Sequence, residues 1–503
     1  MSAPPRPSGT DPAGGTAADG GSSGAAVPSP AEAAARATEA ILHDTLHSAS
    51  RGVVVDSPPG AGKSTLVVRA ARELAATGRP LIVIAQTNAQ VDDLVGRLAA
   101  ADPELPLGRL HSSDPRPYDP ALDEHAAVVT SARITDLGEL PVIVSTAAKW
   151  AWVNTETPWP HAIVDEAYQM RSDALLAVAG LFEKALFVGD PGQLDPFSQV
   201  GAEQWAGLTY DPSASAVTTL LSHNPGLPQH RLPVSWRLPS SAAPLVSAAF
   251  YPYTPFRSGT GPGDRGLTFG TPSDGTPVDR VVDEAAGSGW GLLELPARTT
   301  PRTDPEAVDA VAQVVRSLLT RQGTTTDERS TVPTPLTADR VAVGTAHRDQ
   351  AAAVRAALAA LSLPAVPDGG DPAGPADPAG PAGPADPAAT AESTDGVSLA
   401  AVTVDTANRL QGREFDVTVI LHPLSGRPDA TAFHLETGRL CVLASRHRHA
   451  CIVVCRAGVP ELLDEHPSTE PVQLGVTVKF PDGWEANHAV LSHLAAHTVP
   501  WRR

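Results

Sequence analysis

The chain has 503 residues and a formal net charge of −19, with 50 Pro, 42 Gly and 3 Cys. This length allows two or three domains, while the few cysteines exclude a disulfide framework and a Cys₄ zinc site and favour a reducing, cytoplasmic setting. No apolar stretch predicts a secretion signal, and no run of about 18 apolar residues predicts a membrane span. The acidic balance argues against a broad basic surface, so any nucleic-acid binding needs a local groove.

Two segments contain too little apolar sequence to fold on their own. Residues 1–30 consist mainly of Pro, Gly, Ser and Ala, and we expect a disordered tail there. Residues 367–393 repeat Asp-Pro-Ala-Gly-Pro-Ala, and this proline density excludes both helix and inner strand. Because patterned sequence resumes on both sides, we interpret this Pro/Ala/Gly-rich tract as an insertion.

Short apolar runs alternate with helical patterns through the rest of the chain. In the first half, strands are expected at 53–55, 81–85, 142–145, 162–164 and 185–188. In the second half, they are expected at 291–295, 341–344, 401–404, 417–421 and 451–455. This alternation predicts an α/β fold of parallel sheets with helices on both faces. We therefore expect two tandem doubly wound domains, at 31–230 and 231–465, and a C-terminal extension at 466–503.

The most informative motif is Ser-Pro-Pro-Gly-Ala-Gly-Lys-Ser-Thr at residues 57–65, directly after an apolar run. A phosphate-binding loop needs small residues so that backbone N–H groups converge, a lysine for the β- and γ-phosphates, and a hydroxyl for Mg²⁺. Lys63, one of only four lysines in the chain, and Ser64 supply the last two. The full pattern begins with Gly, where this chain has Ser57. The expected nucleotide-binding residues are Pro59, Gly60, Ala61, Gly62, Lys63, Ser64 and Thr65.

The next polar groups follow two other expected strands. Asp165 and Glu166 come directly after the run at 162–164, at the strand end where open α/β sheets bind ligands. Phosphoanhydride hydrolysis needs one carboxylate for Mg²⁺ and another for the attacking water, and we assign these roles to Asp165 and Glu166. The turn at 189–192 then brings Gln193 near a terminal phosphate. Alternatively, these polar residues could simply lie in solvated turns. The phosphate loop earlier in the chain makes this second interpretation less favourable.

With these motifs in this order, the chain resembles the superfamily 1 helicases, in the branch of the nonsense-mediated-decay RNA helicase and the Okazaki-fragment nuclease-helicase. The resemblance extends from residue 50 to residue 455 and includes motif III, whose glutamine, here Gln193, senses the γ-phosphate. Segments similar to motif Ia, motif III, the first arginine-finger segment, motif V and motif VI are 85–92, 189–196, 232–237, 404–416 and 439–448.

The resemblance implies two RecA-like domains that clamp ATP and Mg²⁺ between them. Arg237 and Arg446 would reach the phosphates from the second domain, with Arg448 as the alternative to Arg446. An arginine finger contributes roughly 10³–10⁵ to turnover in related phosphoryl transfers, so loss of either residue should nearly stop hydrolysis. Gly412 would allow close approach of the backbone, and Glu414 would hold the ribose.

The resemblance also places single-stranded DNA or RNA across both domains, near motifs Ia, Ib and V. The matching positions are Thr87, Asn88, Ser145, Thr146, Thr406 and Asn408. Uncharged polar contacts of this kind would let an acidic chain bind a polyanion. Trp150, Trp152 and Trp159 follow motif Ib; they either stack on bases, at about 1–3 kcal/mol each, or pack in the core, as tryptophan usually does.

We therefore expect an ATP-dependent helicase or translocase that moves on single-stranded nucleic acid, 5′ to 3′ if the branch assignment holds. The chain has little room for the accessory barrel and helical insert of larger relatives, and no counterpart of the glutamine that reads adenine. The alternative is a nucleic-acid-binding regulatory ATPase that works as a switch without processive unwinding and meets a protein partner through its disordered segments. The choice between DNA and RNA stays open.

Overall fold

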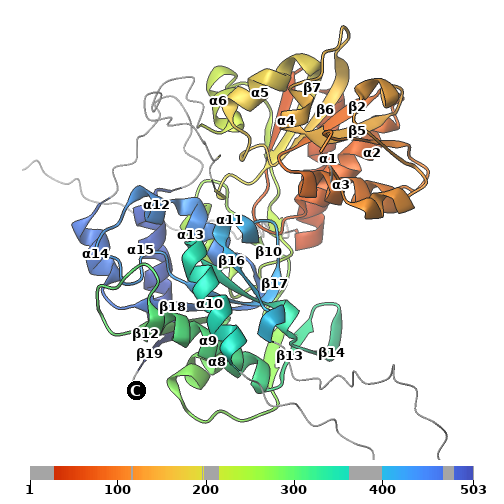
Figure 1. Cartoon of the computed structure of the whole chain (residues 1–503). Helices are drawn as coiled ribbons and strands as arrows, with labels where there is room; N and C mark the ends of the chain where they lie inside the picture. The colour runs from red at the N-terminus through yellow and green to blue at the C-terminus, as the bar shows by residue number, and fades with distance from the viewer. Residues whose placement is uncertain are drawn as a thin grey trace, which may run out of the picture.

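The computed structural model describes residues 28–114, 117–194, 196, 214–361, 399–467 and 481–501. Residues 1–27 of the expected tail and the expected insertion at 367–393 lie outside these ranges. Figure 1 shows two α/β units, one from the first half of the chain, in red to yellow, and one from the second half, in green to blue. Within the described ranges, no helix is long and apolar enough to cross a membrane.

The first unit is an eight-stranded sheet in the order β4-β3-β5-β2-β6-β7-β1-β8, and every strand pair in it is parallel. Its strands are β1 (Gly52–Asp56), β2 (Leu81–Ala85), β3 (Leu107–Leu110), β4 (Val128–Ser131), β5 (Val142–Thr146), β6 (Trp159–Asp165), β7 (Phe182–Gly189) and β8 (Gln229–Arg231). One face is covered by α1 (Pro30–His47), α2 (Lys63–Ala75) and α3 (Asn88–Ala101). The other is covered by α4 (Ala147–Trp150), α5 (Ser172–Val178) and α6 (Ala216–His223).

The second unit is a six-stranded parallel sheet in the order β16-β15-β17-β18-β12-β19. Its strands are β12 (Trp290–Leu295), β15 (Val341–Thr345), β16 (Thr403–Thr406), β17 (Phe415–Leu421), β18 (His447–Arg456) and β19 (Thr498–Pro500). Helices α8 (Pro277–Ser288), α9 (Pro305–Thr320) and α10 (Arg348–Ala360) cover one face. The other face packs against α7 (Ala243–Phe250), α11 (Ala407–Leu410), α12 (Ala432–Leu435), α13 (Thr437–Ala444), α14 (Val459–Glu465) and α15 (Gly483–Leu494).

Two small sheets accompany the second unit. One pairs β9 (Val234–Ser235) with β10 (Arg257–Ser258), and the other joins β11 (Gly266–Phe269), β13 (Gly323–Asp327) and β14 (Ser330–Pro335). The prediction of two doubly wound parallel sheets is confirmed. The strand expected at 401–404 begins two residues later, at Thr403, because Leu399–Ala401 forms a 3₁₀ turn. Beyond residue 465, α15 and β19 join the second unit, where β19 pairs with β12.

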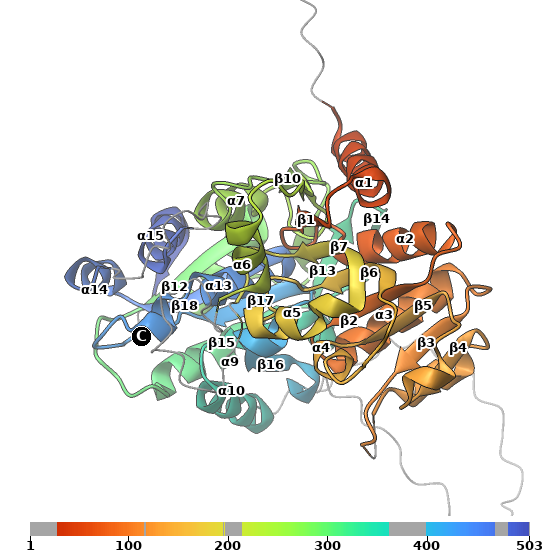
Figure 2. The same ribbon diagram turned by 90° about the horizontal axis from the view of Figure 1, so that it is seen from above.

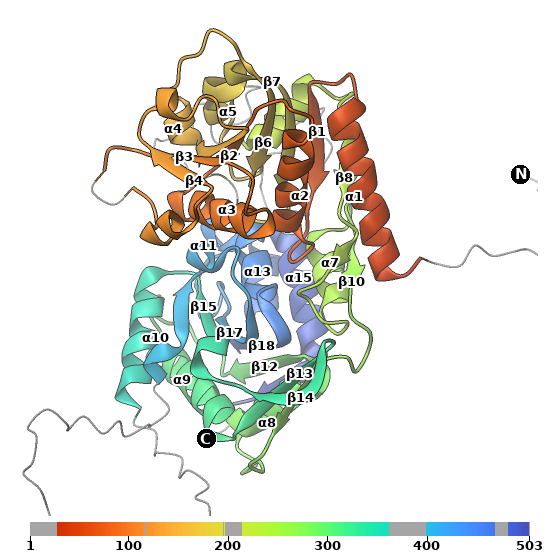
Figure 3. The ribbon, with the colours of Figure 1, turned by 90° about the vertical axis from the view of Figure 1, so that its right-hand side faces the viewer.

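The two units meet along the helices that follow their strand ends. Seen from the side, α2 and α3 of the first unit lie above α11 and α13 of the second (Figure 3). Seen from above, α4 of the first unit and α10 with β16 of the second lie along one side of the molecule (Figure 2). The turns that carry the motifs therefore gather at the junction and along one side.

Candidate nucleotide and nucleic-acid site

The phosphate loop connects β1 to α2 through two glycines in the left-handed region. Gly60 has φ +71° and Gly62, the N-cap of α2, has φ +90°, conformations that other residues adopt only with strain. A Cβ atom on Gly60 would also lie 2.2 Å from Cβ of Arg237. Ser57, at the first position, is buried and donates its backbone N–H to the carbonyl of Gly189 at 2.8 Å. The loop thus ends at a helix N-terminus, whose free N–H groups suit an anion.

Lys63 forms an ion pair with both candidate catalytic carboxylates. Its Nζ lies 2.8 Å from Oδ1 of Asp165, the last residue of β6, and 2.6 Å from Oε1 of Glu166. Burial alone would lower the pKa of Lys63, but the two carboxylates raise it above its ordinary value. Glu166 itself has φ +51°, a costly conformation for a residue with a side chain, and its Oε2 has no hydrogen-bond partner among the described residues.

The segment before α7 clamps the phosphate loop from the other side. Ser235 Oγ donates to the carbonyl of Pro59 at 2.6 Å, and the backbone N–H of Trp236 donates to the carbonyl of Gly60 at 2.8 Å. These bonds place Arg237 directly against the loop. Ser64 is half-buried and Thr65 is exposed in the first turn of α2.

Arg237 contacts Gly412 and Glu414, the two nucleotide-site candidates of motif V. Its Nε lies 3.2 Å from Oε2 of Glu414, and its Nη2 donates to the carbonyl of Gly412 at 3.3 Å. Burial alone would raise the pKa of Glu414, but Arg237 and Arg448 lower it. Gly412 has φ +81°, which accounts for a glycine at this turn. The structure therefore brings the three residues together at the junction.

Arg446 follows α13 and is fully buried. Its Nε donates to the carbonyl of Val442 at 3.0 Å and its Nη2 to Ser445 Oγ at 2.8 Å, while Nη1 has no partner among the described residues. Burial and the nearby charge of Arg237 lower the pKa of Arg446 to about 10. Arg448, by contrast, lies 3.5 to 3.8 Å from carboxylates of three residues. Of these two arginines, only Arg446 has a buried hydrogen-bond donor without a partner among the described residues.

Gln193, after β7, links the two units. Its Nε2 donates to Oδ2 of Asp190 at 2.5 Å, and its Oε1 accepts a hydrogen bond from Nε2 of Gln411 at 2.6 Å. Gln411 belongs to the motif V segment, but its sequence position alone predicts no role for it. Because the pairing joins residues 218 positions apart, no local pattern reveals it.

The donor set fits a nucleotide phosphate and a divalent cation. A lysine, two arginines and the N-terminus of α2 offer positive groups, and Arg446 Nη1 and Glu166 Oε2 are buried without partners in the described part of the chain. Oxygen ligands of the kind that Mg²⁺ prefers are present at Ser64 and Asp165. The cation would be expected to replace the Lys63 ammonium beside these carboxylates.

The predicted nucleic-acid contacts divide into two groups. Thr87 and Thr146 accept hydrogen bonds at the N-termini of α3 and α4, and Asn88 and Asn408 are exposed at the starts of α3 and α11. Thr406, at the end of β16, is 7% exposed. Ser145 is fully buried, and its hydroxyl donates to the carbonyl of Leu110 at 2.6 Å, so it is not placed to touch a strand.

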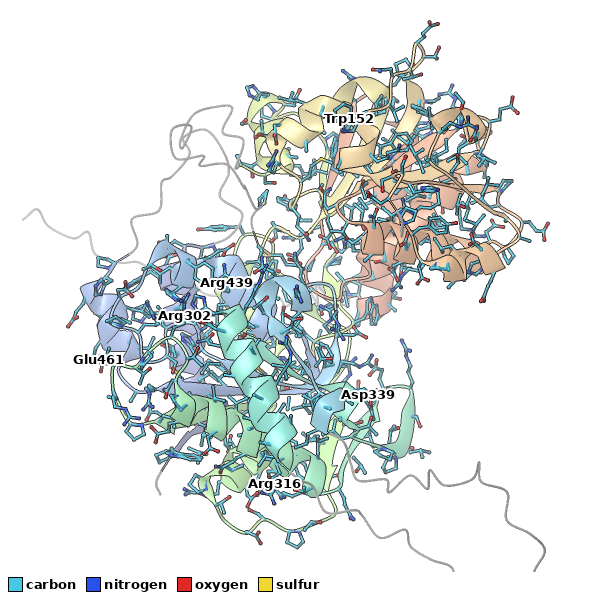
Figure 4. All side chains as sticks on the ribbon, viewed as in Figure 1. Trp152, Arg302, Arg316, Asp339, Arg439 and Glu461 are labelled. Atoms are coloured by element: carbon cyan, nitrogen blue, oxygen red, sulfur yellow. The ribbon has the colours of Figure 1, made fainter. Side chains whose placement is uncertain are left out.

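The tryptophans after motif Ib also divide. Trp150 is fully buried, donates from Nε1 to the carbonyl of Val83 at 3.1 Å, and packs edge-on against Trp159 with ring centroids 5.5 Å apart. These two rings belong to the core. Trp152 is 85% exposed, and Figure 4 shows it on the first unit, with Arg439 on the second.

Comparisons with known proteins give one family match and one curated relative. Residues 35–206 match the family described as an AAA domain. The chain is similar to the DNA replication ATP-dependent helicase/nuclease dna2 of Schizosaccharomyces pombe, at 26% identity over 184 residues, which is 35% of this chain and 13% of that protein.

Two solved helicases are similar to this chain. The PRRSV helicase matches at 13% identity and a TM-score of 0.38, over 84% of this chain and 54% of that one. Arterivirus nonstructural protein 10 (helicase) in complex with DNA matches at 12% identity and a TM-score of 0.36, over 86% and 65%. The chain thus spans less than two thirds of each relative's length. The motif order and the two sequence matches support a relationship of this chain to the superfamily 1 helicases.

Proposed function

We propose that the chain is a cytoplasmic helicase or translocase that hydrolyses ATP between its two units and moves 5′ to 3′ along single-stranded nucleic acid. The observation that carries this proposal is the meeting of Lys63, which pairs with Asp165 and Glu166, with two arginines at the junction of the units. A site shared in this way couples hydrolysis to relative movement of the units, which is what travel along a strand requires.

Each residue has a role in this proposal. Lys63 holds the β- and γ-phosphates, while Ser64 and Asp165 hold Mg²⁺, which supplies neutralising charge for the phosphate oxygens. Glu166 takes the proton of the attacking water through its unpaired carboxylate oxygen. Gln193 senses the γ-phosphate.

Two arginines complete the proposed nucleotide site. Arg446 offers its unpaired Nη1 to the charge that develops on the transferred group, and Arg237 adds a second positive group beside the loop. Gly412 and Glu414, which hold Arg237 from the second unit, lie next to the proposed ribose position. The nucleotide therefore contacts both units at once.

The proposed path of the single-stranded nucleic acid follows one side of the molecule. Helices α3 and α4 of the first unit and α10 and α11 of the second lie on one side of the molecule in Figure 3. Thr87, Asn88, Thr146, Thr406 and Asn408 supply uncharged polar contacts along this path, and Trp152 supplies an exposed ring for stacking. Contacts of this kind do not depend on a broad basic surface, against which the net charge of −19 argues.

Polymer-stimulated hydrolysis tests the proposal. We expect ATP hydrolysis with Mg²⁺ to rise when single-stranded DNA or RNA is added, and a Lys63→Ala variant to lose it with both polymers. Duplexes with DNA or RNA overhangs at either end would then give polymer identity and polarity. Hydrolysis that ignores both polymers would contradict the proposal, and stimulation without strand displacement would favour the regulatory switch.

A further inference from the structure

The loop after β7 is held from the second unit by a residue outside every motif. Asp190 in this loop is 2% exposed. Its Oδ1 accepts hydrogen bonds from the hydroxyl of Tyr251 at 2.7 Å and from the backbone N–H of Gly192 at 3.0 Å. Its Oδ2 accepts the bond from Gln193 described above. Tyr251 follows α7 and is fully buried.

The loop fits closely between two helices of the second unit. A Cβ atom on Gly192 would lie 2.5 Å from Cζ of Tyr251, so the ring lies directly against the loop backbone. On the other side, a Cβ atom on Gly438 of α13 would lie 2.5 Å from the carbonyl carbon of Gln193. Together with the amide of Gln411, these contacts leave Gln193 little freedom.

We propose that Tyr251 is a positioning residue for ATP hydrolysis, which aligns the amide of Gln193 through the carboxylate of Asp190. The hydroxyl of Tyr251 donates to Oδ1 of Asp190, so Oδ2 of the same carboxylate remains to accept the amide of Gln193. Because the phenol belongs to the second unit and the amide to the first, the alignment depends on how the units sit together. This inference rests on the proposed function in one respect: it requires that Gln193 meets the terminal phosphate.

The charge state of Asp190 makes the proposal measurable. Burial raises the pKa of Asp190 to about 6, against the lowering effect of its three hydrogen bonds, and the charge of Glu166 adds to the rise. The other titratable groups that interact electrostatically with the Asp190–Tyr251 pair are Tyr168 after β6 and Cys441 and Arg446 on or after α13. As pH falls through about 6, Asp190 becomes neutral and holds both donors less well.

The test compares Tyr251→Phe with Tyr253→Phe, a matched change at a side chain that is 55% exposed. Loss of a hydrogen bond to a charged group should lower kcat roughly ten- to a hundredfold, with little change in the KM for ATP. The acid limb of the kcat profile should move to higher pH, because the lost hydroxyl no longer lowers the pKa of Asp190. Tyr253→Phe should match the wild type in kcat, KM and pH profile.

A second variant tests the same contacts from the other end. Asp190→Asn should lower kcat, and the double variant with Tyr251→Phe should be no worse than the poorer single one, because both remove one linkage. Additive losses, or a Tyr251→Phe enzyme with wild-type kcat and acid limb, would overturn the proposal. A lower melting temperature with wild-type kcat per folded molecule and an unmoved acid limb would show a purely structural role and overturn the proposal. If the wild-type enzyme hydrolyses no ATP, the proposed function fails instead.

Discussion

Replacing the fully buried Arg446 should change activity without changing stability. Its guanidinium is close to a like charge, Arg237, and the described residues give it no carboxylate within ion-pair distance. We expect Arg446→Met to abolish ATP turnover while leaving the protein about as stable as the wild type. Methionine keeps an unbranched side chain of similar reach and removes the charge.

The size of both effects follows from the structure. A fall in the pKa of Arg446 from 12.5 to about 10 corresponds to roughly 3 kcal/mol against the charged form in the fold. The substitution also removes the hydrogen bonds to Val442 and Ser445, which contribute about 1 kcal/mol each. The net change in the free energy of unfolding should therefore lie within about 1 kcal/mol of zero. Turnover should fall about 10³-fold or more, as for other arginine fingers.

Arg456 offers a matched control at the end of β18. It is as deeply buried, but its Nε lies 2.6 Å from Asp304 and its Nη2 2.7 Å from Glu306. Arg456→Met leaves Asp304 buried without its partner, so we expect a loss of about 3–5 kcal/mol in stability. Denaturant unfolding midpoints and steady-state phosphate release would be measured for both variants.

We therefore expect opposite effects of the two substitutions on the unfolding midpoint and on turnover. Arg446→Met should keep its unfolding midpoint and lose turnover, whereas Arg456→Met should lose its midpoint and keep turnover per folded molecule. If Arg446→Met unfolds as early as Arg456→Met and its folded fraction still hydrolyses ATP at the wild-type rate, then Arg446 is structural. The proposed role at the phosphates would then be refuted.

Three further changes test the rest of the site. Glu166→Gln should keep nucleotide affinity in a fluorescent-nucleotide titration yet lower turnover about 10²- to 10⁴-fold, the range for a lost general base; wild-type turnover would remove Glu166 from that role. Trp152→Ala should weaken strand affinity about 5- to 150-fold without changing the melting temperature, and Trp152→Phe should restore part of it; equal affinity in all three would exclude stacking. Gly60→Ala should abolish nucleotide binding because its methyl group meets Arg237, whereas Gly78→Ala, with φ +76° and no atom within 4 Å, should cost only backbone strain. Similar losses in the two glycine variants would argue against the steric explanation.

The central strands of both sheets were predictable because they are apolar on both faces. All residues of β2, Leu-Ile-Val-Ile-Ala, are fully buried, as parallel strands between two helix layers require. The strands of these two sheets that were not predicted are β3, β4, β8 and β19, which are short and partly polar. Thus β3 contains the buried Arg109, paired with Asp92, and the residues of β8 are Gln-His-Arg.

The predicted phosphate loop and carboxylate pair lie side by side in the structure, and each could be found because one short segment contains it. Ser145 shows why the contacts of a single residue next to a motif are harder to predict from sequence. Alternate residues of a strand point to opposite faces, so Ser145 lies buried against Leu110 while the next residue, Thr146, caps α4. The contacts of Tyr251 and Gln411 depend on how the two units meet, which no local pattern contains.

The charges at the junction suggest how nucleotide binding would draw the units together. Lys63 pairs with Asp165 and Glu166, and Arg237 pairs with Glu414, so phosphate contacts at these two residues would exchange one ionic partner for another. Arg446 differs, because the described residues give it no acidic partner within ion-pair distance and burial already disfavours its charge. A phosphate near its Nη1 would therefore add a net attraction, and this attraction grows as the second unit approaches. Since a ligand shifts a conformational equilibrium only through its differential affinity for the two states, Arg446 is the residue we expect to convert ATP binding into closure, and phosphate release into reopening.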